Sequence, residues 1–445
     1  MLFNSARTIY IQILLIITLV HIPLSINKTS INKNEYNKTL SLILHNELMD
    51  SDCSNYIDKQ VKKFMDKWKL HGVSVAISKD DKLLFAKGYG LANVEDSIPT
   101  TPQHLFRYAS VSKLITATAI MKLKEEGKLY LNQTVFGEDG ILYDEKYQHF
   151  KDKRYKQITV EHLLRHEAGF YRRVKEPIFT PLRVAEKMNV SAPPSTDVNI
   201  EYLLKRRLPY RPGSSVTYSN MGYIILSKII EKLSGMSYED YIKTEILSKC
   251  GIYNMHLAYN FPDQKYSNEV NYYEHDGTDK IPACDGSGKL VNRCNGGNNI
   301  RGLLGAGAWI GSAVDLLKFT SAIDGIDYRP DILSKESIEY MTKNYSSRFP
   351  IGWMKIDYNN NWWRTGTLNG TSVLLEKQED GLTWVFISNT STWRGPKLPY
   401  RINNMMKKTL RKIKSWPEND LFNNFSFKPF TINIDYEEEK NNCCS

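Results

Sequence analysis

The sequence predicts an α+β fold, in which an antiparallel sheet is built from both ends of the chain and a helical region is inserted between them. Two pairs of strand-like runs carry this prediction. Residues 73–78 and 82–89 flank a short polar turn near the start, and residues 372–376 and 383–388 flank Asp380-Gly381 near the end. Helical patterns occupy much of the chain between the two pairs. We therefore expect one domain, over about 56–415, whose sheet needs both ends of the chain.

The first half of the chain contains two well-defined helical patterns. Residues 56–70 place apolar side chains on one face, as a surface helix does. Residues 114–123 are apolar or small on nearly all sides, which is typical of a helix inside a protein. Residues 158–170 and 221–250 also have helical character.

The second half begins with a stretch that has no clear helix or strand periodicity. Residues 251–300 are polar and rich in Gly and Asn, so we expect loops over or beside a functional site. Ser312 and Asp315 form a capping box that begins another helix. After the last strand, Ile402–Lys414 alternates apolar and basic residues as an amphipathic helix does, and 416–445 is expected to be a tail.

Composition excludes some classes of protein. The chain has 445 residues, of which 41% are hydrophobic and 24% charged, as in ordinary globular proteins. Its formal net charge is +10, but the basic residues are scattered or lie on the C-terminal helix. No zinc-finger or phosphate-loop pattern is present, and no Cys or His cluster has metal-ligand spacing. We expect no nucleic-acid partner, no metal and no cofactor.

The N-terminus predicts secretion. Arg7 precedes the apolar run Ile9–Val20, and a Pro/Ser exit follows, as in a secretory signal peptide over residues 1–25. Residues 26–55 are polar and are expected to form a flexible lead-in. An uncleaved membrane anchor and a mitochondrial presequence remain alternatives. N-glycosylation sequons add modest support for secretion; they lie at Asn27, Asn37, Asn132, Asn189, Asn344, Asn369, Asn389 and Asn424.

The six cysteines leave the redox state open. Cys284 and Cys294 flank a Gly-containing segment, where a disulfide would close a small loop. Cys53 and Cys250 either pair or stay free, and Cys443 and Cys444 lie near the end of the chain.

The first chemical motif is Ser110-Val111-Ser112-Lys113, at the start of the apolar helix. Positions i and i+3 share a helix face, so the Lys113 amine can lie beside the Ser110 hydroxyl. A serine becomes a good nucleophile when a base takes its proton, and burial can lower the pKa of a lysine enough for that role. Alone, the motif is better explained by a capping serine followed by an exposed lysine.

Two further motifs follow in order. Tyr218-Ser219-Asn220 leads into the helix near 221, where a tyrosine near a cation can relay protons and an amide can bind a carbonyl. Arg364, Thr365, Gly366 and Thr367 precede a strand, where a cation, hydroxyls and a glycine would let a substrate backbone approach. Each alone also fits an ordinary loop or a strand with a bulge.

Together, the three motifs resemble those of the serine β-lactamase-like and penicillin-binding-protein-like hydrolases, the S12 peptidase group, and most of all the animal LACTB-type proteins. The resemblance runs from about residue 56 to 415 and implies a β-lactamase/transpeptidase-like fold. It implies that Ser110 is acylated, that Lys113 is the general base and that Tyr218 relays the proton. It assigns substrate binding to Asn220, Arg364, Thr365 and Gly366, and an oxyanion hole to the backbone N–H groups of Ser110 and Thr367.

One position departs from the family pattern. The third motif usually begins with Lys or His, whereas this chain has Arg364. An arginine can clamp a carboxylate but cannot act as a base, so a true lactamase is less favoured. His166 is interpreted as structural, because Lys113 already supplies a base, and the glycines at 302, 305 and 307 as close backbone packing beside the site.

The sequence thus favours a secreted serine hydrolase that cleaves a peptide, amide or ester bond. Its partner would be a peptide or small acyl substrate, and a homo-oligomer is left open. The alternative is a catalytically silent binding protein on the same scaffold, and a third possibility is a self-assembling structural protein linked through its C-terminal cysteines.

Overall fold

The computed structural model describes residues 52–170, 176–343, 347–418 and 420–424, which all belong to one compact unit of the chain. The predicted signal segment and nearly all of the lead-in lie outside these residues, as does the end of the tail. None of the described helices combines the length and apolarity needed to cross a membrane.

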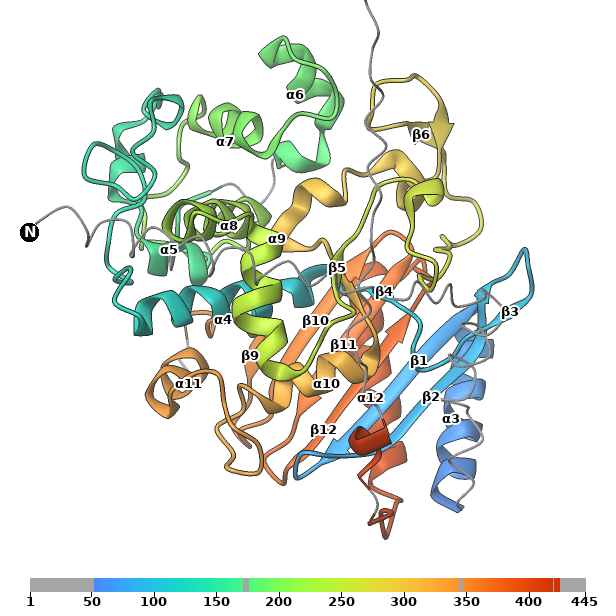
Figure 1. Cartoon of the computed structure of the whole chain (residues 1–445). Helices are drawn as coiled ribbons and strands as arrows, with labels where there is room; N and C mark the ends of the chain where they lie inside the picture. The colour runs from blue at the N-terminus through green and yellow to red at the C-terminus, as the bar shows by residue number, and fades with distance from the viewer. Residues whose placement is uncertain (1–51, 171–175, 344–346, 419, 425–445) are drawn as a thin grey trace, which may run out of the picture. The chain divides into compact units, whose positions relative to one another are not determined.

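The framework is a seven-stranded sheet with the order β3-β2-β1-β12-β11-β10-β9, in which every neighbouring pair is antiparallel. Strand β1 pairs with β12 from Val73 opposite Ser388 to Lys79 opposite Leu382. In Figure 1 the blue strands of the chain's beginning therefore lie beside the orange strands of its end. The predicted α+β architecture, with its sheet built from both ends, is confirmed. The strands of this sheet are β1 (Gly72–Lys79), β2 (Lys82–Asn93), β3 (Ile98–Pro99), β9 (Lys355–Ile356), β10 (Trp362–Leu368), β11 (Thr371–Lys377) and β12 (Leu382–Ser388).

The two faces of the sheet support separate cores. On one face, the terminal helices α3 (Asp52–Trp68) and α12 (Leu398–Leu410) pack against alternate residues such as Val75, Leu374 and Phe386. On the other face, Val373, Leu375 and Val385 join a much larger core with the inserted helical region. Because side chains of a strand alternate between faces, each strand contributes to both cores.

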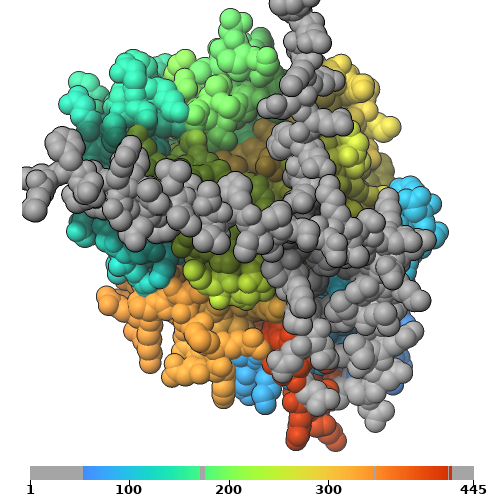
Figure 2. Space-filling model, in the orientation of Figure 1, coloured from blue at the N-terminus to red at the C-terminus, as the bar shows by residue number. Residues whose placement is uncertain are grey.

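The inserted region is mostly helical. Its teal and green segments gather at the upper left of the face drawn in Figure 2. Its helices are α4 (Ser112–Glu125), α5 (Val160–Leu164), α6 (Pro181–Met188), α7 (Thr196–Leu204), α8 (Asn220–Ser234), α9 (Tyr238–Tyr241), α10 (Ala313–Ser321) and α11 (Lys335–Thr342). Short strands β4 (Phe106–Arg107), β5 (His256–Leu257) and β8 (Trp309–Gly311) form a second sheet, and β6 (Ile281–Pro282) pairs with β7 (Leu290–Val291).

Two predicted helices are shorter than the sequence indicated. The helix expected over 158–170 ends at Leu164, because His166 and Gly169 adopt left-handed backbone conformations. The helix expected over 221–250 breaks at Gly235, a left-handed C-cap, and a new helix starts after the capping Ser237. The capping box of Ser312 and Asp315 is present as predicted.

The predicted disulfide between Cys284 and Cys294 is absent. Both thiols are free and buried, and Cys294 Sγ lies 3.4 Å from the carbonyl oxygen of Tyr272, in packing contact with Gly370. Cys250 is also free. The side chain of Cys53 and the two C-terminal cysteines lie outside the described residues. Among the sequons, Asn389 is fully buried, and its amide bonds the backbone of Gly72 and Leu91, so a glycan cannot be attached there in the folded protein.

Candidate active site

Ser110 lies in a one-turn 3-10 helix, Ala109–Val111, that leads directly into α4. Ala109 has a φ of 49°, a left-handed conformation that is uncommon for a residue with a side chain. Such strain costs on the order of 1–2 kcal/mol and persists only where the surrounding structure enforces it. The surroundings here are the carbonyl of Trp309, which accepts the Tyr108 N–H, and strand β10, which packs on the turn.

Lys113 is fully buried in the first turn of α4, and its amine lies close to three oxygen atoms. Its Nζ lies 2.5 Å from the carbonyl oxygen of Ala306, 2.8 Å from Asn220 Oδ1 and 3.4 Å from Ser110 Oγ. Burial lowers the pKa of Lys113, and the positive charge of Arg364 lowers it further. A neutral amine would donate its two N–H groups to the two carbonyl oxygens and direct its lone pair at Ser110. The position is suited to a general base.

Tyr218 completes the contacts of the serine hydroxyl. Its hydroxyl donates to Ser110 Oγ at 2.8 Å, and the Lys113 amine lies 5.0 Å from the centre of its ring. Burial raises the pKa of Tyr218, but the positive charges of Lys113 and Arg364 outweigh burial and bring it below its ordinary value. A tyrosine in this position can exchange a proton with both the serine and the lysine.

His166 is stacked beneath the tyrosine. The two ring centres are 4.4 Å apart, and the His166 Nδ1 accepts a hydrogen bond from the Ser219 N–H. Burial, with help from Lys113 and Arg364, holds the pKa of His166 well below its usual range. The imidazole is therefore neutral and supports the Tyr218 ring, in line with the structural role expected from the sequence.

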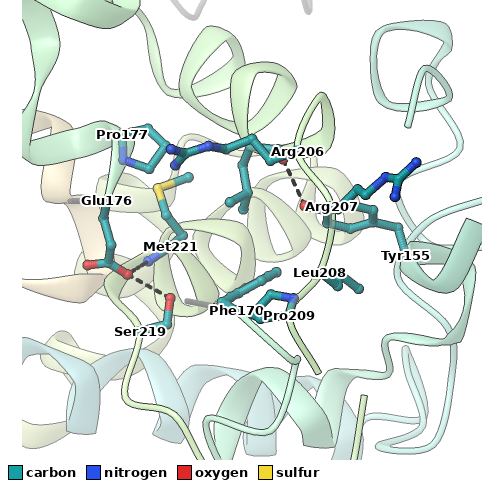
Figure 3. Close-up of a pocket in the computed structure, with 11 residues that line it drawn as sticks. Tyr155, Phe170, Glu176, Pro177, Arg206, Arg207, Leu208, Pro209, Ser219 and Met221 are labelled. Carbon is teal, nitrogen blue, oxygen red and sulfur yellow. Dashed lines mark hydrogen bonds between the residues drawn. The ribbon is translucent and has the colours of Figure 1, made fainter. Parts of the chain in front are cut away.

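Asn220 is the first residue of α8, and its amide joins the lysine to a carboxylate. Its Oδ1 accepts from Lys113, while its Nδ2 donates to Glu176 Oε2 at 2.6 Å. Figure 3 shows Glu176 and Ser219 at the wall of a small pocket that Phe170, Pro177 and Met221 also line. Sequence reasoning did not find Glu176, which lies 44 residues before Asn220 in a segment without a chemical motif.

Arg364 is almost completely buried, and its guanidinium points into the protein. The Nε and Nη2 atoms donate to the backbone carbonyl oxygen of Ser110 at 2.9 and 2.5 Å. These donors hold the nucleophile turn in place, so they are not directed at an open cleft as the predicted carboxylate clamp would require.

The other predicted residues of β10 divide between the two faces of the sheet. Gly366 faces the nucleophile: a Cβ built on it would lie 2.2 Å from the carbonyl oxygen of Tyr108 and 3.2 Å from the Ser110 nitrogen. Thr365 is paired with Leu374, whose side chain belongs to the core under the terminal helices, so the side chains of Thr365 and Thr367 lie on the face away from Ser110. Strand β9 pairs with β10 only at Trp362 and Trp363, so the stretch of β10 beside the site has no partner in β9.

The glycine run at 302–307 lies directly behind the lysine. A Cβ on Gly305 would come within 2.3 Å of Thr116 Oγ1 and 2.6 Å of Ser227 Oγ, so the backbone must pack closely against α4 and α8. This packing brings the Ala306 carbonyl to Lys113. The described residues contain no group of three or more metal-ligating side chains.

A serine hydroxyl approached by a buried amine and a phenol, at the start of a buried helix packed on an antiparallel sheet, places the protein among the serine hydrolases that act through an acyl-enzyme. Residues 57–404 match the family model described as Beta-lactamase, and the chain belongs to this family.

The curated relatives are distant. Protein flp of Staphylococcus aureus is 28% identical over 236 residues, which are 52% of this chain and 44% of that protein. A penicillin-binding protein of Bacillus subtilis is 29% identical over 281 residues, 62% of this chain and 56% of that protein. The matched regions thus span only about half the length of these relatives.

Solved structures share the fold more completely. The octameric penicillin-binding protein homologue from Pyrococcus abyssi is 26% identical, with a TM-score of 0.60 over 81% of this chain and 79% of that chain. The D-amino acid amidase from Ochrobactrum anthropi, in complex with L-phenylalanine amide, is 20% identical, with a TM-score of 0.60 over 81% of this chain and 98% of that chain. At that identity, the likeness to the amidase concerns the fold alone.

Proposed function

We propose that this protein hydrolyses a peptide, amide or ester bond through an ester formed on Ser110, with Lys113 as the general base. The observation that carries the proposal is the convergence of two groups on one hydroxyl: Tyr218 Oη at 2.8 Å and Lys113 Nζ at 3.4 Å from Ser110 Oγ. Because its pKa is lowered, the buried amine of Lys113 is neutral, and so able to take a proton, at a lower pH than the amine of an exposed lysine.

The reaction runs in two halves. In the first, Ser110 Oγ attacks the substrate carbonyl carbon while its proton passes to Lys113. Tyr218 relays that proton to the leaving nitrogen or oxygen, which departs as the amine or alcohol. In the second half, water attacks the ester carbonyl, one of its protons passes to the Tyr218–Lys113 pair, and the acid leaves as Ser110 regains its hydrogen.

Fewer side chains are available to bind the substrate than the sequence indicated. The backbone N–H groups of Ser110 and Thr367 form the proposed oxyanion hole, because Gly366 brings β10 against the nucleophile turn. Arg364 and Asn220 are engaged inside the protein through Ser110 and Lys113. The stretch of β10 beyond Trp363, which β9 does not pair, would then bind the substrate backbone, which suits an extended peptide or amide.

Labelling with active-serine probes tests the proposal. The full chain is treated with a fluorophosphonate and with a fluorescent penicillin, beside Ser110→Ala and Lys113→Ala. We expect the wild type to be labelled, Ser110→Ala not at all, and Lys113→Ala at least about 100-fold more slowly. If the folded wild type reacts with neither probe, the catalytically silent binding protein becomes the better interpretation. Labelling of Lys113→Ala at the wild-type rate would refute the base.

Three finer assignments are also proposals. We infer that residues 1–25 are a secretory signal and that the protein is extracellular, which N-terminal sequencing of the secreted product tests. Within the family we infer the S12 group and its LACTB-type members, which a phylogenetic tree tests. The octameric state of the Pyrococcus abyssi homologue supports a homo-oligomer here, which light scattering tests.

A further inference from the structure

Glu176 uses its two carboxylate oxygens for different tasks. Oε1 accepts hydrogen bonds at the start of α8, from Ser219 Oγ at 2.7 Å and from the backbone N–H groups of Asn220 at 2.7 Å and Met221 at 3.3 Å. The bonds to Ser219 and Met221 are drawn in Figure 3. Oε2 instead accepts from the side-chain amide of Asn220 at 2.6 Å.

The bond to Oε2 decides how the Asn220 amide is oriented. An amide has a donor nitrogen on one side and an acceptor oxygen on the other. A carboxylate accepts hydrogen bonds only, so the nitrogen must face Glu176 and the oxygen must face Lys113, where it accepts at 2.8 Å. The lysine amine then keeps two acceptors, Asn220 Oδ1 and the Ala306 carbonyl, and its remaining direction points at Ser110.

Capping of α8 does not account for this arrangement. Ser219 is already the N-cap, because its Oγ accepts the Gly222 N–H, and Glu176 serves the remaining helix N–H groups through Oε1 alone. An oxygen needed only for capping would not have to reach the Asn220 side chain.

We propose that Glu176 is a positioning residue of the active site, which orients the Asn220 amide and thereby directs the Lys113 amine at Ser110. This inference rests on the proposed function, because it concerns the efficiency of Lys113 as the base.

The charge of Glu176 provides a readout that capping would not affect. Burial is the main cause that lowers the pKa of Lys113, and the charge of Arg364 lowers it further. Tyr218 opposes that lowering most, and the negative charge of Glu176 opposes it to a smaller extent. Neutralising Glu176 should therefore lower the pKa of Lys113 further, so that the lysine loses its proton at a lower pH.

Glu176→Gln separates the two tasks. The Gln carbonyl oxygen can still accept from Ser219 and the two N–H groups, but its NH₂ group replaces Oε2 and opposes the Asn220 NH₂ group. The Asn220 amide should turn over and present a donor to Lys113. We expect the fluorophosphonate labelling rate at its pH optimum to fall roughly 10- to 100-fold, the loss of one hydrogen bond to a charged group. The acid limb of the pH–rate profile should move to lower pH.

A second substitution should restore the lost acceptor. In Glu176→Gln with Asn220→Asp, the Gln NH₂ group donates to one Asp oxygen and the other oxygen accepts from Lys113. We expect this double variant to be faster at high pH than either single variant, with its acid limb above that of the wild type, because a carboxylate now contacts the lysine. Asn220→Asp alone places two carboxylates against each other and should be slow.

Ser219→Ala is the matched control, because it removes the α8 cap and one donor to Glu176 but leaves the Asn220 side chain alone. We expect a lower melting temperature and an unmoved acid limb. The positioning role is overturned if Glu176→Gln leaves the limb in place, or if the double variant is no faster than Glu176→Gln at any pH. These outcomes are distinct from failure of the proposed function, in which the wild type itself would not be labelled through Ser110.

Discussion

Arg364 places a positive charge beside the buried Lys113 and Tyr218, and this charge lowers the pKa of both. Burial is the larger cause of the lowered pKa of Lys113, and Arg364 adds to it. In Arg364→Met the pKa of Lys113 should rise, so the acid limb of the labelling profile should move to higher pH, opposite to the shift expected for Glu176→Gln. Loss of both donors to the Ser110 carbonyl should also cost about 1–3 kcal/mol of unfolding free energy. Arg364→Lys keeps the charge, so its limb should stay near that of the wild type. An unmoved limb in Arg364→Met would refute the electrostatic role.

The residues that sequence patterns could predict are those with a fixed local spacing. Ser110 and Lys113 are one helical turn apart, and Tyr218 and Asn220 flank a helix start. Their proposed chemical roles could therefore be inferred from the sequence. The role of Glu176 could not be inferred in this way, because a glutamate before a proline indicates only an extended backbone. The orientation of the Arg364 side chain could not be predicted either. The motif identifies its position in the sequence, but the buried carbonyl of Ser110 determines where the guanidinium points.

Among the elements, β10 and the nucleophile turn approach each other so closely that even a methyl group would not fit between them. A Cβ on Gly366 would lie 2.2 Å from the Tyr108 carbonyl oxygen, so Gly366→Ala must push the strand away from Ser110. We expect a loss of at least about 100-fold in labelling rate, as for misplacement of a catalytic group by about 1 Å. Gly222→Ala in the first turn of α8 is the control. Its new Cβ would meet its nearest neighbour at 3.4 Å, and labelling should be retained. Equal rates for the two variants would contradict the close approach.

The strand runs and the buried helix were predicted well, because their periodicity reflects burial on one or all sides. The early end of the helix at Leu164 was not predicted. His166 and Gly169 leave the helical conformation there and bring the 165–170 segment under the site, and a local sequence pattern does not indicate such tertiary packing. The loop over Cys284 and Cys294 shows the same limit. Spacing allows a disulfide, but Cys294 packs against Tyr272 and Gly370 instead.

For the whole molecule, the central pairing of β1 with β12 makes the sheet depend on residues about 300 positions apart in sequence, such as Val73 and Ser388. The terminal helices then cover one face, and Lys407 of α12 pairs with the buried Glu376 of β11. Part of the predicted tail also packs against the domain: Asp420 accepts from the Leu83 N–H, and Phe422 is buried in the larger core on the other face. The active site lies on the opposite face, so α3 and α12 support it through the sheet, and none of the site residues described above lies on these two helices.

A cluster of buried charges joins three distant parts of the chain and makes stability depend on pH. Asp324 follows α10, Asp81 lies in the β1–β2 turn, and Lys377 ends β11. Burial raises the pKa of Asp324 to about 7, and the charge of Asp81 adds to this while Lys377 opposes it. Because the folded pKa lies above the unfolded one, the contribution of Asp324 to stability is complete below about pH 4 and is lost as pH rises through 7.

Asp324→Asn mimics the protonated form at every pH, and its Oδ1 can still accept from the Ile326 N–H. In urea unfolding, the variant should match the wild type near pH 4 and exceed it by roughly 1–4 kcal/mol at pH 8. Asp327→Asn, an exposed position in the same loop, is the control for charge alone and should give a small difference at both pH values. A stability difference between Asp324→Asn and the wild type that does not change between pH 4 and 8 would contradict a raised pKa of Asp324 in the folded protein.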